Sequence, residues 1–118
     1  MLRGDVVLCQ LPMPSTLLTQ FKLRPAVVIS KNINNRRLDD LIVAPCTSNI
    51  ARSREPTQYL IDGAELASAG VVVPSVVRCE ALMTIPKATV LRVVGHLSTG
   101  AMIAIAACLK DADRKSVV

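Results

Sequence analysis

Short runs of apolar, β-branched residues recur along the chain, and polar segments containing proline or glycine separate them. The runs cover residues 4–11, 25–31, 40–46, 57–61, 74–80, 82–86 and 90–97. Runs of this length that are rich in Val and Ile and bounded by turn residues are typical of β-strands. The pattern therefore predicts a protein built from many short strands.

The pattern changes near the C-terminus, where apolar residues recur at three- and four-residue steps. These positions are Met102, Ile105, Ala106 and Leu109. They predict a helix over residues 99–110 with one apolar face and with Ser98 as its N-cap, followed by a frayed tail at 111–118. A single helical turn is predicted at residues 64–69, before Gly70. Many strands with a late helix predict a mainly β fold, a small, strongly curved sheet or barrel carrying a C-terminal α-helix.

The connections differ in length and polarity. Residues 12–22 are predicted to form a loop, which is long for a hairpin connection, and loops of that length in a compact domain are often functional. Residues 32–37 are predicted to form a polar turn. With 118 residues, the chain is predicted to be a single domain, residues 1–118.

Charge and composition limit the classes of partner that the protein can be expected to bind. The net charge of +5 favours a polyanionic partner, either nucleic acid or an acidic protein. Only 2% of residues are aromatic, so arginines and backbone groups would have to replace the aromatic platforms of many RNA-binding modules. Charges within residues 1–5 and the lack of a long apolar segment predict a cytoplasmic protein without a membrane span.

Four cysteines lie far apart, each inside an apolar segment, and no C-x-x-C pair is present. This spacing favours buried, reduced thiols over a zinc site or a redox motif.

Arg24 is the first candidate for chemistry. It stands before Pro25 and an apolar run, and a residue before proline is held in an extended conformation. A guanidinium at the mouth of a buried strand can bind a phosphate or a carboxylate through forked donors. A surface ion pair explains Arg24 equally well.

Three further positions place polar groups against apolar strands. Thr47 follows a predicted strand, and an ordinary turn hydroxyl is the alternative. Arg78 and Glu80 are two residues apart on one predicted strand and so would share a face, as a site or as a structural salt bridge. His96 is interpreted as a packed or surface residue and not as a base.

Several blocks in this order resemble the MazF/PemK family of toxin endoribonucleases, from about residue 3 to residue 109. The blocks are RGDVVLCQL, KLRPAVVIS, LIVAPCTSN, PSVVRCEALMTIPK and GHLS before the terminal helix. The resemblance implies an SH3-like barrel, a homodimer, and neutralisation by a cognate antitoxin with an acidic, flexible tail. It also implies sequence-specific cleavage of single-stranded mRNA without a metal or cofactor, through attack of the 2′-hydroxyl to give a 2′,3′-cyclic phosphate.

The same resemblance implies a set of site residues. The catalytic residues would be Arg24, Thr47, Arg78 and Glu80, with glutamate in place of the family's aspartate. Loops 12–22 and 49–56 are expected to set sequence preference. The RNA-binding residues would be Gln20, Lys22, Ser48, Asn49, Arg52 and Arg54.

One departure concerns chemistry. Family members often carry glycines, and some a histidine, in the loop before the R-P block, whereas residues 15–22 here contain neither. Two other functions remain open: a non-cleaving toxin of the same fold that binds a protein such as a topoisomerase, and a catalytically silent homologue that binds antitoxin.

Overall fold

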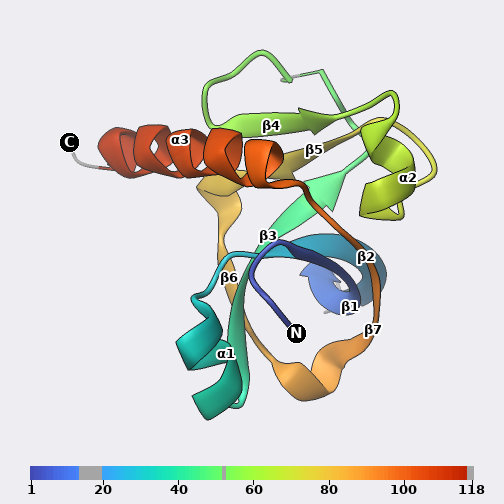
Figure 1. The fold of residues 1–118 in the computed structure, drawn as a ribbon, viewed down its shortest axis with the longest axis vertical. Helices are drawn as coiled ribbons and strands as arrows, with labels where there is room; N and C mark the ends of the chain where they lie inside the picture. Colours follow the sequence, from blue (N-terminus) through green and yellow to red (C-terminus); the bar gives the residue numbers. More distant parts are fainter. Residues whose placement is uncertain (14–19, 52, 117–118) are drawn as a thin grey trace.

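Strand β3 (Asp40–Thr47) organises the fold, because it pairs with three other strands. Its first residues pair with β6 (Met83–Pro86), its middle with β2 (Gln20–Val28), and its end with β5 (Ser75–Arg78). Because β3 pairs with different strands along its length, the sheet bends at β3 and is strongly curved (Figure 1). The computed structural model describes residues 1–13, 20–51 and 53–116.

All the strand pairs are antiparallel, in the order β4-β5-β3-β2-β1-β7 with β6 beside β3. The remaining strands are β1 (Asp5–Met13), β4 (Gln58–Ile61) and β7 (Val90–His96). Short helical segments join them: α1 (Asn32–Arg37), α2 (Glu65–Ala69), η1 (Cys79–Ala81) and η2 (Lys87–Thr89). The C-terminal helix is α3 (Thr99–Ser116). The predicted class, a curved β-sheet with a terminal helix, is confirmed.

The apolar alternation of the strands builds two cores. On β1, Val6 faces one core, whereas Val7 and Cys9 face the other. On β2, Val27 faces the first core, and its neighbours Ala26 and Val28 face the second. Alternate side chains of a strand point to opposite faces, so both faces of this sheet are covered. One core lies inside the curve of the sheet, and the other lies under α2 and α3.

Helix α3 begins as predicted and ends later. The Ser98 hydroxyl oxygen accepts a hydrogen bond from the backbone N–H of Ala101 at 3.1 Å, which confirms the N-cap. Ile105 is fully buried in the core with Cys108. The predicted frayed tail was wrong, since the helix continues to Ser116. None of the helices within the described residues is long and apolar enough to span a membrane.

Helix α1 replaces the predicted polar turn. Its Asn35 is buried, donates to the backbone oxygen of Ser30 at 3.0 Å and accepts from the Ser30 hydroxyl at 2.5 Å. The Lys87 ammonium group donates to the backbone oxygen of Asn35. These contacts come from distant segments, so the local pattern, which lacks an apolar face, did not predict the helix.

Other boundaries also moved. Strands β1 and β2 extend into the predicted loop at residues 12–22, which shrinks the connection to residues 14–19, outside the described residues. The strand predicted at 74–80 ends at Arg78. The predicted helical turn before Gly70 is confirmed as α2, and Gly70 adopts the left-handed φ of 75° at its C-cap.

Candidate functional site

Two prolines stand where the ladder between β2 and β3 ends. The pairing runs from Val28 opposite Val43 to Ala26 opposite Pro45, and Pro25 precedes Ala26. Proline has no N–H to donate, so a ladder cannot continue normally through it. Beyond this point β3 pairs with β5 instead, and a cavity of about 740 Å³ opens, lined in part by Arg24, Pro25, Cys46 and Ser48.

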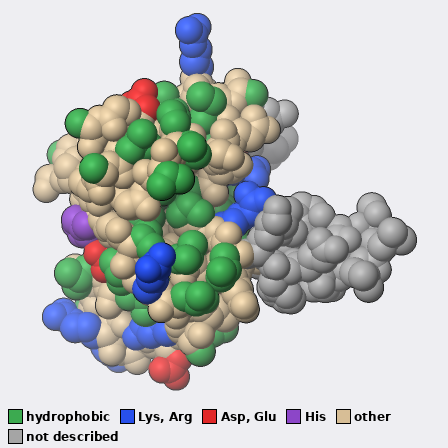
Figure 2. Space-filling model, turned by 90° about the vertical axis from the view of Figure 1, so that its right-hand side faces the viewer, with side chains coloured by type: hydrophobic (Ala, Val, Ile, Leu, Met, Phe, Trp, Pro, Cys, Tyr) green, Lys and Arg blue, Asp and Glu red, His purple; other side chains and the backbone are tan. Residues whose placement is uncertain are grey.

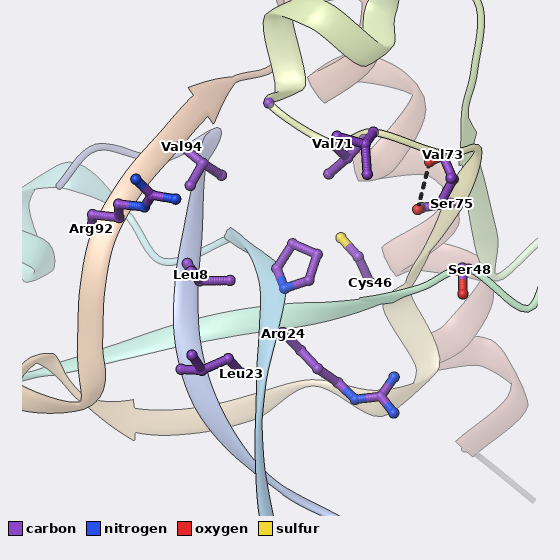
Figure 3. Close-up of a pocket in the computed structure, with 13 residues that line it drawn as sticks. Leu8, Leu23, Arg24, Cys46, Ser48, Val71, Val73, Ser75, Arg92 and Val94 are labelled. Carbon is purple, nitrogen blue, oxygen red and sulfur yellow. Dashed lines mark hydrogen bonds between the residues drawn. The ribbon is translucent and has the colours of Figure 1, made fainter.

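Arg24 lies within β2 and not immediately before the strand, which corrects the predicted strand start at residue 25. It pairs with Cys9 of β1, and it is half-buried where β2 passes from exposed residues to the buried stretch that begins at Ala26. Its side chain extends away from Leu8 and Arg92, the residues on the other side of the cavity (Figure 3). The guanidinium therefore sits at the rim of the cavity.

The end of β3 separates this cavity from a second one. Ser48 lines the larger cavity, whereas Thr47 lines a cavity of about 310 Å³ together with Asn49, Gln58 and Arg78. The Thr47 hydroxyl accepts a hydrogen bond from the backbone N–H of Asn49 at 3.2 Å, as a turn hydroxyl does. Its own proton stays available for a second partner, so the turn role and a binding role are compatible.

Arg78 and Glu80 are in contact, although they do not share a strand as predicted. Arg78 ends β5 and Glu80 lies in η1, and the Nε of Arg78 donates to Oε1 of Glu80 at 3.2 Å. Gln58 of β4, paired with Arg78, donates its side-chain amide to the same carboxylate oxygen at 2.9 Å. The turn into η1 brings the carboxylate back over the strand pair.

These contacts set the protonation state of Glu80. Burial on its own would raise the pKa of Glu80, but the hydrogen bonds from Gln58, from the backbone and from Arg78, with the arginine's charge, lower it below its ordinary value. Glu80 is therefore ionised at neutral pH, and it can accept a proton but not donate one.

The predicted site residues thus fall into two groups on either side of β3. Arg24 and Ser48 line the larger cavity, while Thr47, Asn49 and Arg78 line the smaller one, with Glu80 attached through Arg78. Arg54 is exposed and lines neither of these two cavities. Arg52 lies outside the described residues, and so do the side chains of Gln20 and Lys22.

Sequence reasoning missed two residues of this region. Gln58 was missed because its contact with Glu80 depends on the register between β4 and β5, which no local pattern contains. Arg92 lines the larger cavity from β7. A signal for Arg92 was available, since it is a charged residue within an apolar strand.

The other titratable candidates stay outside both cavities or are inert. His96 is exposed and contacts Asp5 at 2.7 Å, in keeping with the predicted surface role. All four cysteines are buried and free, as predicted. Burial raises the pKa of Cys9 to about 11 and that of Cys46 to about 12, so these thiols are not nucleophiles at neutral pH.

Comparison with solved structures finds several that share this fold. The toxin MazF-mt6 of Mycobacterium tuberculosis matches with a TM-score of 0.76 and 25% identity, over 93% of this chain and 96% of that one. An endoribonuclease in complex with its cognate antitoxin, from a mycobacterial species, matches at 0.74 and 20% identity, over 97% and 95%. A MazE–MazF structure from Deinococcus radiodurans matches at 0.74 and 17% identity, over 100% and 97%.

A search of curated proteins found no match. The family model for the PemK-like, MazF-like toxin of type II toxin–antitoxin systems matches residues 2–112, nearly the whole chain. The curved sheet, the terminal helix and the R-P block where the β2–β3 pairing ends agree with this match. The chain therefore belongs to the PemK-like, MazF-like toxin family.

Proposed function

We propose that this protein is an endoribonuclease toxin that cleaves single-stranded mRNA at specific sequences without a metal ion. The observation that carries the proposal is the position of Arg24, half-buried at the rim of a large cavity where two prolines part β2 from β3. Family membership supports it, as does the name endoribonuclease carried by a structural neighbour.

The reaction uses a nucleophile that the substrate brings. The ribose 2′-oxygen forms a bond to the adjacent phosphorus, and the bond from phosphorus to the 5′-oxygen breaks, which leaves a 2′,3′-cyclic phosphate and a 5′-hydroxyl. No metal-bound water is required for this attack. In this mechanism the scissile phosphate lies across the end of β3, between the two cavities. Arg24 stabilises the extra charge on the phosphoryl oxygens from the larger cavity with its forked donors, and the Thr47 hydroxyl adds a neutral hydrogen bond from the smaller one.

Glu80 is the proposed base. Its carboxylate is held ionised by Gln58 and Arg78, so it can take the proton that leaves the 2′-hydroxyl. Arginine holds its protons too tightly to give one up, so Arg24 contributes charge and water supplies the proton to the 5′-oxygen.

A single assay tests the proposal. Matched RNA and DNA oligonucleotides are incubated with the protein in EDTA, and the products are separated and their ends identified. We expect cut RNA with 2′,3′-cyclic phosphate and 5′-hydroxyl ends, and intact DNA, because DNA lacks the attacking hydroxyl. Equal cutting of both substrates, or dependence on added metal, would contradict the mechanism. Intact RNA together with growth arrest would favour the non-cleaving toxin.

The proposal includes two protein partners. A cognate antitoxin with an acidic tail is supported by the net charge of +5 and by the antitoxin complex among the structural neighbours. A second copy of the chain, in a homodimer, is expected from the family resemblance. Light scattering of the protein alone and with its antitoxin tests both.

A further inference from the structure

The larger cavity is mostly apolar. One wall is the sheet face formed by β1, β2 and β7, with Leu8, Leu23 and Val94, and the other is the segment of residues 70–75, with Val71 and Val73. Figure 2 shows this side of the molecule, where hydrophobic side chains gather at the centre with Lys and Arg side chains among and beside them. At about 740 Å³, the cavity has the size of a small-molecule site and exceeds what a single phosphate needs.

Arg92 is the second cation of this cavity. It pairs with Leu8 of β1, and Leu8 pairs with Pro25 of β2, so the three residues lie in a row across one sheet face. Two strand spacings of about 4.8 Å put the Arg92 backbone about 10 Å from that of Pro25. The two positions are therefore separated by the width of one strand, β1.

The charge of Arg92 is not used within the protein. The side chain is exposed, and the described part of the chain gives it no hydrogen bond or ion pair. By contrast, Arg78 is paired with Glu80, and Arg3 donates to the backbone oxygen of Ile29 at 3.0 Å. Figure 3 shows the Arg92 guanidinium turned toward the cavity, on the same side as Leu8 and Val94. A cation beside an apolar surface attracts an anion that also has an apolar part.

We propose that Arg92 and this aliphatic wall form a second nucleotide subsite, which binds the phosphate and base of a nucleotide next to the scissile bond. This inference rests on the proposed function. The base lies on Leu8, Val71 and Val94, which replace the aromatic platform that the chain lacks, and Arg92 contacts the phosphate. Arg24 and Arg92 line opposite sides of the same cavity (Figure 3), so an RNA strand bound at Arg24 on the rim can cross the cavity to reach Arg92.

The test measures binding apart from cleavage. The probe is a fluorescent RNA with a 2′-deoxynucleotide at the mapped cleavage site, which binds but cannot be cut, titrated by anisotropy at several salt concentrations. We expect Arg92→Ala to weaken binding about tenfold and to reduce the slope of log K against log salt by about 0.7, as the loss of one phosphate contact does. Arg92→Lys restores the slope because it restores the charge. In the cleavage assay, KM rises and kcat changes little.

Matched controls separate the subsite from general effects. Arg37→Ala removes another exposed cation, on α1 and outside the cavity, and leaves binding unchanged. Val73→Ala, at the cavity wall, weakens binding without changing the salt slope. Ile103→Ala, on the exposed side of α3, changes neither the affinity nor the salt slope.

The outcomes distinguish the two proposals. Wild-type affinity in Arg92→Ala, or an equal loss in Arg37→Ala, overturns the subsite while cleavage by the wild type leaves the proposed function intact. If the protein does not cut RNA but binds an unmodified RNA in a manner that depends on Arg92, the proposed function is overturned, whereas the binding of a nucleotide at Arg92 is supported. If Arg92→Ala loses affinity only for an acidic antitoxin peptide, the cavity binds protein and the subsite is wrong.

Discussion

The side-chain amide of Gln58 donates a hydrogen bond of 2.9 Å to the carboxylate of Glu80, across the turn from β5 into η1. Gln58 is almost fully buried, and its own Oε1 has no hydrogen-bond partner among the described residues. Leaving a buried acceptor unpaired costs about 1–3 kcal/mol. The amide is nevertheless oriented with its NH₂ group toward Glu80, and the hydrogen bond holds the carboxylate in place. Gln58 is therefore a positioning residue for the proposed base.

Replacement of Gln58 by Leu should therefore move the pH dependence of cleavage. The hydrogen bond from Gln58 lowers the pKa of Glu80, so its removal raises that pKa and moves the acid limb of the kcat/KM profile to higher pH. The pH profile of single-turnover cleavage measures the shift. Glu80→Gln serves as the control, since it should remove the limb altogether, and an unchanged limb in Gln58→Leu would argue against Glu80 as the base.

The same pKa shift links Glu80 to stability. Its folded pKa lies below the ordinary value of 4.5, so the ionised carboxylate favours the folded state above that pH. This contribution disappears as the pH falls through the lowered, folded-state pKa. We expect Glu80→Gln to reduce the melting temperature at pH 7 and to differ less from the wild type near pH 3. A constant difference across this range would show that the contribution of Glu80 is not electrostatic.

Arg24 should be required for the chemical step. Arg24→Ala removes the donors that we propose face the phosphoryl oxygens, and the loss of one such group typically costs about 100- to 1,000-fold in rate. Arg24→Lys keeps the charge but loses the fork, so it should recover only part of the rate. Single-turnover cleavage with saturating enzyme separates this effect from binding. Full activity in Arg24→Ala would remove the central residue of the proposed mechanism.

The strands could be predicted because burial dictates their sequences. Val27 and Val28 belong to different cores and are both fully buried, so β2 had to be apolar on both faces. The extended conformation of Arg24 followed from Pro25, because a residue before proline is held out of the helical region, but Arg24 lies inside β2 and not before it. Helix α1 could not be predicted, because Ser30 and Lys87, both outside the helix, bind its Asn35.

The arrangement of the site was less accessible to sequence reasoning. Glu80 was placed on one strand with Arg78, but the chain turns into η1 at Cys79, where the backbone N–H of Cys79 donates to Thr57 at 3.0 Å. The separation of Arg24 from Thr47 into two cavities depends on which strand each end of β3 pairs with. Register and partner choice are tertiary properties, so composition and periodicity do not contain them.

Gly95 should be indispensable for the contact between β7 and α2. A Cβ at this position would lie 2.3 Å from the carbonyl carbon of Ala69 and 2.4 Å from the carbonyl oxygen of Ser68. Backbone atoms cannot yield as a side chain does, so we expect Gly95→Ala to lower the free energy of unfolding by about 3 kcal/mol. Urea denaturation measures this. Gly100→Ala is the control, because the added Cβ makes only an ordinary van der Waals contact with the Ser98 hydroxyl oxygen at 3.9 Å and should raise stability by about 0.5 kcal/mol.

The cysteines should be inert in the folded protein. All four are buried, and burial raises the pKa of Cys79, which precedes the proposed base, to about 12. Thiolate is the reactive form, so iodoacetamide at pH 7.5 should modify the native protein very slowly and modify all four cysteines rapidly in denaturant. Mass spectrometry counts the modified sites over time. Ala88→Cys provides the control, since residue 88 is exposed in η2 and a thiol there should react without denaturant. A native thiol that reacts as fast as this control would mean that the core opens readily at that position. If that thiol were Cys79, the same opening would displace the neighbouring Glu80.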